Sequence, residues 1–314
     1  MSSRHQRPPN PRDILDEAIE HNSVSQLVEA VQIARSNPPR NSSYEKFLAS
    51  ALSACVEDGK LDLVKHLLEQ ESVPLTSLSP TKVWSKFSIP FVEFLTAHGW
   101  DINQQALRGS TGRCRRLVDL ACHDQDIITW LVDHGARVDG GEYEYEIFPQ
   151  PAPLLETCAL QGSVSTFKYL QERGARLGRR TLHLAAGAAA ALGVDPKVED
   201  DSIVDASGST GSKEAERKRA KLEMLRFLVE EVKLDVNAMD TDIPHHAYHL
   251  GTPICYAASK SNGEAVVRWL LEKGADPNIK NMEGADAEYV AKDHGCEKPL
   301  AVLKEWKAAK GHSE

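Results

Sequence analysis

The sequence predicts an all-α fold, a solenoid of stacked helix-turn-helix units with short β-hairpin-like fingers. Three observations lead to this prediction. A short string, usually with a glycine, recurs along the 314 residues, an amphipathic run precedes each copy, and a segment rich in small residues lies upstream of each run. Self-similarity at such a period is typical of repeat proteins, in which each unit buries its apolar face against its neighbours.

The recurring string is the first of these observations. It occurs at residues 98–103 (HGWDIN), 134–139 (HGARVD), 173–178 (RGARLG) and 273–278 (KGADPN), and a copy without glycine lies at 233–237 (KLDVN). The first three glycines, Gly99, Gly135 and Gly174, are 36 and 39 residues apart. Glycine adopts positive φ at little cost, so we expect each string to end a helix. The Asp and Asn residues that follow suit a tight turn.

The segments before each string predict two helices. Leu61, Val64, Leu67 and Leu68 are spaced to form one helical face, and similar apolar runs precede the other strings. Upstream lie small-residue segments, at 51–55 (ALSAC), 117–122 (LVDLAC), 155–159 (LETCA), 181–186 (TLHLAA) and 252–258 (TPICYAA). Small side chains let neighbouring helices approach closely. Each unit is therefore expected to contain a helix, a short link, a second helix, a turn and an extended finger.

This arrangement resembles the ankyrin repeat. The best match covers residues 251–278, which follow the family pattern except that Cys255 stands at its His position. His183 retains that His, although Thr181 is displaced by one position. At the His position of other units stand Ser53, Asp119 and Glu156. The Thr–His hydrogen bond of the family is therefore expected to be mostly absent. We count about seven units between Tyr44 and Trp306, and a weaker one at Asp13–Ser36.

The sequence divides into one repeat domain with two tails. We expect a disordered N-terminal tail at 1–11, an ankyrin-repeat domain of about seven or eight degenerate repeats at 12–308, and a C-terminal tail at 309–314. An acidic and Gly/Ser-rich stretch at 193–213 interrupts one repeat between its two helices, and its composition predicts a flexible insertion.

Composition narrows the classes of function. A hydrophobic share of 41% and a charged share of 26% are typical of folded soluble proteins, and a net charge of -9 disfavours nucleic acid and anionic membranes as partners. No run reaches the roughly 18 apolar residues that a membrane span needs. The N-terminus has no secretory signal, and the six cysteines form no CxxC pair. We therefore predict an intracellular monomer, cytoplasmic rather than nuclear.

Catalytic and cofactor motifs are weak, so we predict no catalytic residue, no cofactor, no metal and no enzymatic activity. Residues 208–213 superficially resemble a phosphate-binding loop, but the order is Gly-Ser-Lys and no strand precedes it. Cysteines at small-residue positions are expected to be buried fillers. The basic run at Arg217–Lys221 leaves open a nuclear import signal. His245, His246 and His249, with Asp242 nearby, leave open a metal site.

The fingers carry the predicted function. Resemblance to the family implies protein recognition on the concave face and finger tips. The expected partner-binding residues are Trp100, Asp101, Tyr143, Tyr145, His245, His246 and Tyr248. Trp100 stands where the family has a small residue, so we expect its indole to be partly exposed, although such aromatics could equally pack against a neighbouring repeat. The acidic and aromatic stretch at 142–148 would steer a partner with a basic surface.

The predicted function is a non-enzymatic protein-binding scaffold or adaptor. One alternative is a regulatory subunit or inhibitor of one specific enzyme, which would use the same surface for a narrower target. A second alternative, from a different class, is a metal-binding protein that uses the His-rich finger.

Overall fold

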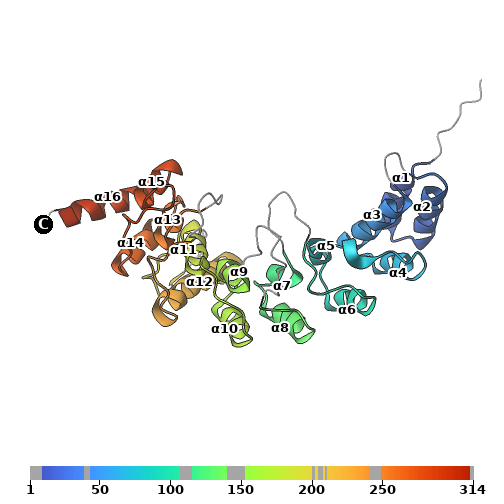
Figure 1. The fold of residues 1–314 in the computed structure, drawn as a ribbon, viewed down its shortest axis with the longest axis horizontal. Coiled ribbons are helices and arrows are strands. Elements are labelled where there is room, and N and C mark those ends of the chain that lie inside the picture. Colours follow the sequence, from blue (N-terminus) through green and yellow to red (C-terminus); the bar gives the residue numbers. More distant parts are fainter. Residues whose placement is uncertain are drawn as a thin grey trace, which may run out of the picture. The chain divides into compact units, whose positions relative to one another are not determined.

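A computed structural model describes residues 9–38, 43–106, 115–139, 153–199, 202–203, 208, 211–240 and 249–311. Within these ranges the chain is built from helices that follow one another in pairs, without a β-strand (Figure 1). The all-α prediction is therefore confirmed. The helices fall into two compact units, Met1–Leu120 with Asp133–Ala136, and Ala121–Val132 with Arg137–Glu314.

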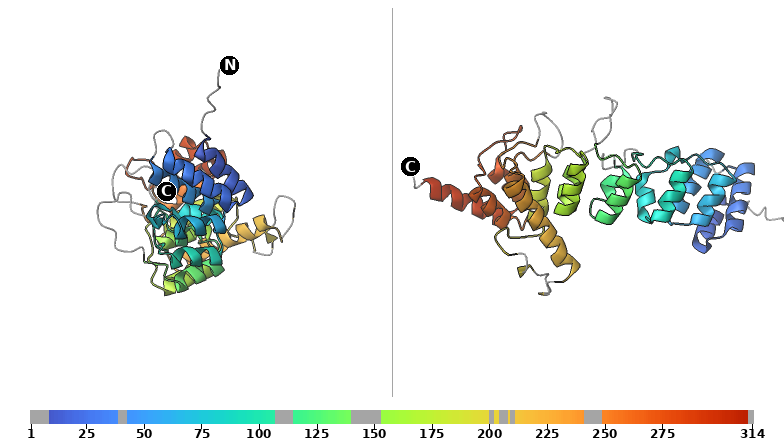
Figure 2. Two further views of the ribbon diagram at one scale, coloured as in Figure 1. Left: turned by 90° about the vertical axis from the view of Figure 1, so that its right-hand side faces the viewer. Right: turned by 90° about the horizontal axis from the view of Figure 1, so that it is seen from below.

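Helical hairpins form the first unit, and they lie side by side in Figure 2. Its elements are α1 (Pro11–His21), α2 (Val24–Ser36), α3 (Tyr44–Glu57), α4 (Leu61–Glu69), the 3₁₀ turn η1 (Leu75–Ser77), α5 (Pro80–Ser85), α6 (Ile89–Ala97) and α7 (Leu117–Leu120). α1 packs against α2, and α3 packs against both α4 and α5. Of the apolar stripe predicted in α4, Val64 and Leu67 are fully enclosed, whereas Leu61 and Leu68 are half-buried. Leu63, which was not part of the predicted stripe, is also fully enclosed.

The second unit repeats this organisation. It contains α8 (Gln125–Asp133), α9 (Leu154–Gln161), α10 (Val164–Glu172), α11 (Thr181–Ala191), α12 (Lys213–Arg226), the π-helical turn η3 (Phe227–Glu231), α13 (Pro253–Ala258), α14 (Glu264–Glu272), α15 (Ala287–Asp293) and α16 (Glu297–Gly311). α11 packs between α9 and α13. Ala185, Ala186, Ala189 and Ala190 of α11 are buried, as the small-residue pattern predicts.

The glycine turns end helices as expected. Gly99, Gly174 and Gly274 have φ values of 93°, 90° and 92°. In each case the amide of the next residue donates to a carbonyl five residues back, at 2.9–3.0 Å, which satisfies a helix-end acceptor. Among the described residues, positive φ also occurs without glycine at Asn22, Ser72 and Lys233, with φ values of 50°, 52° and 58°. The amide after Asn22 donates to a carbonyl five residues back, and the amides after Ser72 and Lys233 donate to carbonyls six residues back. The copy at 233–237 is therefore a true member of the series.

The insertion lies between α11 and α12, as the sequence predicts. Its described residues contact α12, which follows it in the second unit. Arg226 donates from Nε to the carbonyl oxygen of Pro196 at 2.9 Å, and from Nη2 to that of Val198 at 2.7 Å. Val194 and Ile203 are buried. The flexibility of 193–213 as a whole stays a prediction.

The terminal helices reach beyond the boundaries expected from the sequence. α1 begins at Pro11, where the side chain of Asn10 accepts a hydrogen bond from the Arg12 amide and caps the helix. α16 continues to Gly311. In the described part of the chain, each helix is too short or too polar to cross a bilayer.

Candidate protein-binding surface

Three of the described fingers begin with the same tight turn. A carboxylate oxygen, Oδ1, of an aspartate accepts a hydrogen bond from the backbone amide of the asparagine two residues later. The pairs are Asp101 with Asn103 at 2.8 Å, Asp235 with Asn237 at 2.9 Å, and Asp276 with Asn278 at 2.9 Å. Such turns hold the local backbone in one conformation. The Asp/Asn turn predicted from the sequence is thus confirmed at these positions.

The asparagines also join successive fingers. In the first unit, Nδ2 of Asn103 donates to the carbonyl oxygen of Gly135 at 2.9 Å. In the second unit, Nδ2 of Asn237 donates to the carbonyl oxygen of Gly274 at 3.1 Å, and its Oδ1 accepts from the amide of Asp276 at 2.8 Å. In these two places, one finger therefore helps to set the position of the next finger in its unit.

Trp100 does not contribute exposed surface. Its side chain is only 3% exposed, and Nε1 donates to the carbonyl oxygen of Leu78 at 3.3 Å. The expectation of a partly exposed indole is wrong. The physical reason is that the residue after the turn glycine faces the interior of the repeat, as Ala175 and Ala275 also do. Trp100 is thus a packing residue of the first unit.

The other predicted binding residues divide into two groups. Asp101 is exposed and its Oδ1 is engaged in the turn at the base of its finger. Tyr143, Tyr145, His245, His246 and Tyr248 lie outside the described residues, so their roles stay predictions. Residues 142–148, from which a partner with a basic surface was predicted, also lie outside the described residues, so that partner stays a prediction.

The first helices replace the missing Thr–His bond with other polar contacts. Asp119 accepts from the Arg116 amide at 2.8 Å and pairs with its guanidinium at 3.1 Å, and both side chains are buried. Glu156 accepts from the Arg180 amide at 2.8 Å, and pairs with its guanidinium at 3.3 Å. These contacts hold the residues that precede α7 and α11.

His183 ties its helix to the following finger. Its Nε2–H donates to the carbonyl oxygen of Ala238 at 2.9 Å, and its ring meets the Tyr256 ring edge to face at 5.2 Å. Burial lowers the pKa of His183 to about 4, so the imidazole is neutral at physiological pH. Tyr256 donates to Oδ2 of Asp240 at 2.8 Å. This hydroxyl has a raised pKa, chiefly because it is buried and secondly because of the Asp240 charge.

Asp240 closes the base of the finger that contains residues 241–248. Its amide donates to the carbonyl oxygen of Gly251 at 3.1 Å, and its Oδ2 accepts from the Gly251 amide at 3.2 Å. His249 lies beside it, with Nδ1 3.4 Å from the same Oδ2. Among the described residues, no three His, Cys, Asp or Glu side chains gather in a way that could hold a metal ion.

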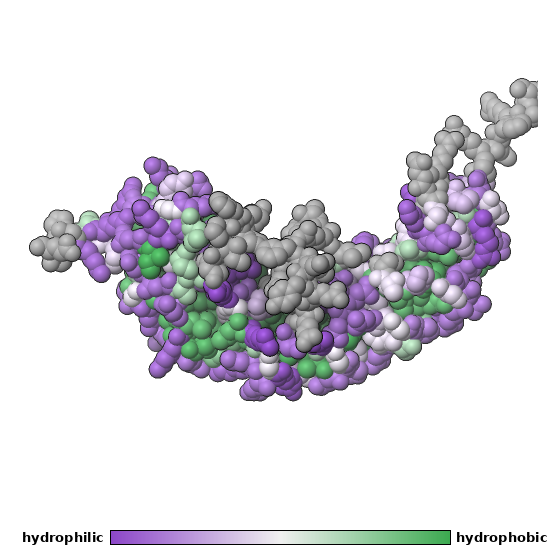
Figure 3. Space-filling view, viewed as in Figure 1, coloured by the Kyte–Doolittle hydropathy of each residue, from purple (hydrophilic) through white to green (hydrophobic). Residues whose placement is uncertain are grey.

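Three exposed apolar side chains on or beside fingers were not predicted. Leu177 is 43% exposed, Met282 is 52% exposed, and Tyr289 is 60% exposed. On the face drawn in Figure 3, hydrophobic residues show in patches among hydrophilic ones. A sequence signal existed for Leu177 and Met282, because each lies among turn-forming residues after a helix, where an apolar side chain has little to pack against.

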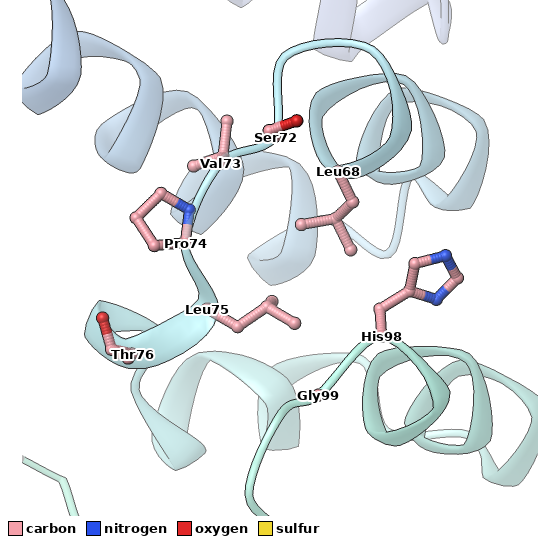
Figure 4. A pocket seen from close by; sticks show the side chains of 8 residues that line it. All are labelled: Leu68, Ser72, Val73, Pro74, Leu75, Thr76, His98 and Gly99. Carbon is pink, nitrogen blue, oxygen red and sulfur yellow. The ribbon is translucent and has the colours of Figure 1, made fainter.

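A hollow of about 270 Å³ lies in the first unit, between the segment after α4 and the end of α6 (Figure 4). Leu68, Leu75 and His98 point toward it in the figure. The other lining residues are Ser72, Val73, Pro74, Thr76 and Gly99. The lining contains no carboxylate, thiol or lysine, and Nε2 of His98 lies 3.7 Å from Oε1 of Glu69.

The described cysteines occupy interior positions. Cys55, Cys122, Cys158, Cys255 and Cys296 are buried, as expected for fillers at small-residue positions. Burial raises the pKa of both Cys55 and Cys158 to about 12. A thiol in that range stays protonated at neutral pH and is a poor nucleophile.

Comparison with known families gives one match, within the second unit. Residues 250–282 match the ankyrin repeat. The matched segment contains α13, α14 and the turn at Gly274, which together make one complete repeat. α9 with α10, and α11 with α12, are earlier helix pairs in the same unit, and each pair is followed by an equivalent turn. A comparison with curated proteins gave no match for the chain.

Proposed function

We propose that the chain is a non-enzymatic protein-binding scaffold that holds a partner on its fingers and the adjoining first helices. The observation that carries the proposal is the set of hydrogen bonds that fix the fingers. Asn237 joins two fingers of the second unit, and Asp235 and Asp276 hold the turns of those fingers. A surface that is ordered before binding loses less entropy when a partner docks. The ankyrin match at 250–282 supports protein recognition as the activity.

Exposed apolar side chains support the same surface. Leu177, Met282 and Tyr289 are each more than two fifths exposed, and buried apolar or aromatic contacts commonly supply much of the energy of protein association. Polar or charged residues adjoin them in the sequence, at Arg176, Asn281 and Glu288, and such residues are common at the rim of a binding site. Loops positioned by a rigid helical framework are a common place for recognition.

The test is affinity purification from cells followed by mass spectrometry. Wild type is compared with Leu177→Glu, Met282→Glu and Tyr289→Glu, which place a charge at each exposed apolar position. Ile89→Glu is the matched control, because Ile89 is exposed to a similar degree but begins α6, a second helix of its hairpin. Thermal melting verifies that all variants are folded.

We expect at least one finger variant to lose partners that the control keeps. Retention of every partner by all three variants would place the binding surface elsewhere. The number of partners also separates two functions: an adaptor should recover several proteins, whereas a regulatory subunit or inhibitor should recover one enzyme.

A further inference from the structure

We propose that residues 173–180, the basic finger, bind a carboxylate-rich segment of the partner protein. This inference rests on the proposed function and names the chemistry of the ligand. The basic finger contains Arg173, Arg176, Arg179 and Arg180 and no carboxylate. Four arginines in eight residues contrast with the net charge of -9 for the whole chain. The basic finger is thus locally positive in a chain whose net charge is negative.

At one turn position the charge of the basic finger is opposite to that of the two later fingers of the unit, whereas the preceding finger also has an arginine there, Arg137. Arg176 stands two residues after the turn glycine, where Asp276 stands in the matched ankyrin repeat. Asp276 uses its carboxylate to close its own turn. Gly178 takes the place of the asparagine in the basic finger, so that turn has neither partner. Arg176 is exposed, and its guanidinium can therefore face a ligand.

Arg180 is already neutralised, because it pairs with the buried carboxylate of Glu156 at 3.3 Å. Arg173 stacks its guanidinium 3.6 Å from the centre of the Tyr169 ring. A stacked guanidinium keeps its N–H groups in plane, where they can still donate to a carboxylate. Glu172, exposed at the end of α10, is the carboxylate that adjoins the basic finger in sequence.

The backbone of the basic finger is fixed at both ends. The Ala175 amide donates to the carbonyl oxygen of Leu170 at 3.0 Å. At the other end, Oγ1 of Thr181 donates to the carbonyl oxygen of Gly178 at 2.8 Å and accepts from the Gly178 amide at 3.2 Å. Gly178 also packs so closely on Glu156 that a Cβ atom would overlap it. Arg176 and Leu177 are therefore presented from an ordered loop.

The composition of this surface favours an acidic peptide over a polyanion. Guanidinium groups match carboxylates in a two-pronged geometry, and Leu177, 43% exposed, offers an apolar contact beside them. A ligand with carboxylates that flank an apolar residue satisfies both features. Nucleic acid would need a longer basic surface to outweigh repulsion by a chain of charge -9.

The test uses the full chain and a fluorescein-labelled synthetic peptide of about twelve residues that carries glutamates around one leucine, the pattern suited to paired arginines. Fluorescence anisotropy measures binding at low salt. We expect saturable binding, a loss of about tenfold in affinity for Arg176→Glu, and a smaller loss for Arg176→Lys, which keeps the charge but not the forked geometry. Leu177→Ser should weaken binding several-fold.

The controls isolate the basic finger. Lys280→Glu removes an exposed cation from another finger of the same unit and should change affinity less than about twofold. A peptide with glutamine in place of glutamate should not bind. Equal affinity of Arg176→Glu and wild type, absence of binding by the glutamate peptide, or tighter binding of a single-stranded oligonucleotide would each overturn the proposal. If Arg176→Glu keeps every partner that Met282→Glu loses, the basic finger is refuted while the scaffold function stands.

Discussion

Nε1 of Trp100 donates a hydrogen bond to the carbonyl oxygen of Leu78, which lies 22 residues earlier, at 3.3 Å. Gln104 donates to the same carbonyl oxygen at 2.7 Å and to that of Thr76 at 3.0 Å. A large indole therefore sits where other repeats have alanine, and it binds the segment that precedes α5. This contact explains why Trp100 belongs to the interior of the first unit.

Trp100→Ala should destabilise the first unit rather than change a binding surface. Loss of the buried ring should reduce the free energy of unfolding by about 3–5 kcal/mol. Hydrogen exchange measured by mass spectrometry should rise in α5 and α6 and stay unchanged in α13. Trp306→Ala is the control, because Trp306 is only partly buried and should cost about 1 kcal/mol. A variant of full stability that loses partners would show that the indole serves recognition instead.

Two of the left-handed turns without glycine, those at Lys233 and Ser72, should become more stable when glycine replaces the residue with positive φ. Lys233→Gly and Ser72→Gly should each raise the free energy of unfolding by about 0.5–1 kcal/mol, because positive φ is costly for a residue with a Cβ atom. The reverse changes, Gly174→Ala and Gly274→Ala, should lower it by about 1–2 kcal/mol. A Cβ atom at either glycine would meet nothing within 4 Å, so these controls report backbone strain alone. Urea denaturation gives the free energy of unfolding of all four variants. Equal stability of Lys233→Gly and wild type would contradict the assignment of a strained left-handed turn to Lys233.

Gly162→Ala should be among the most damaging small substitutions. A Cβ atom there would lie 2.6 Å from both the carbonyl oxygen of Cys122 and Sγ of Cys158. Because one of these atoms is backbone, relief requires movement of a neighbouring segment, and we expect a loss of about 2–3 kcal/mol. Gly211→Ala is the matched control, since a Cβ atom at Gly211 meets nothing within 4 Å. Thermal unfolding of the two variants should differ clearly; similar melting temperatures would argue against the tight packing.

Acid should destabilise the second unit through His183. Its pKa is lowered from 6.5 to about 4, chiefly by burial, so the unfolded chain takes up the proton first as pH falls. The stability linked to this group is present above pH 6.5 and is lost progressively as pH falls through about 4. The loss is on the order of 2–3 kcal/mol.

The pH experiment compares wild type with His183→Gln, which keeps a donor for the Ala238 carbonyl but does not titrate. Urea denaturation at pH 7 and at pH 4 should show a larger decrease for wild type than for the variant. Parallel decreases in the two proteins would mean that other groups carry the acid sensitivity.

The fold could be predicted because the signals that mark each repeat lie in its local sequence. Gly99, Gly174 and Gly274 mark helix ends through a backbone requirement that needs no tertiary information. The Ala-rich run in α11 marks a close helix contact for a similar reason, since only small side chains permit it. Lys233 shows the limit of that reasoning: its turn is imposed by the surrounding repeat, and nothing in the residue type signals positive φ.

The candidate site was less predictable because it depends on which way side chains point. From the sequence, the Trp100 indole was expected to be partly exposed. The residue after the turn glycine faces inward instead, and the hydrogen bond to Leu78 shows where the indole lies. The arginines of the basic finger were visible in the sequence. Only the structure shows that Arg180 is paired with Glu156 and that Arg176 is exposed.

The second unit carries different charges at one equivalent turn position: Arg137 and Arg176 in the earlier fingers, then Asp235 and Asp276 in the two later fingers that Asn237 joins. An extended ligand lying across these fingers would meet a cation at one end and anions at the other. Reversing such a ligand end for end would bring like charges together. Such an order of charges would favour one direction of a bound chain over the reverse direction.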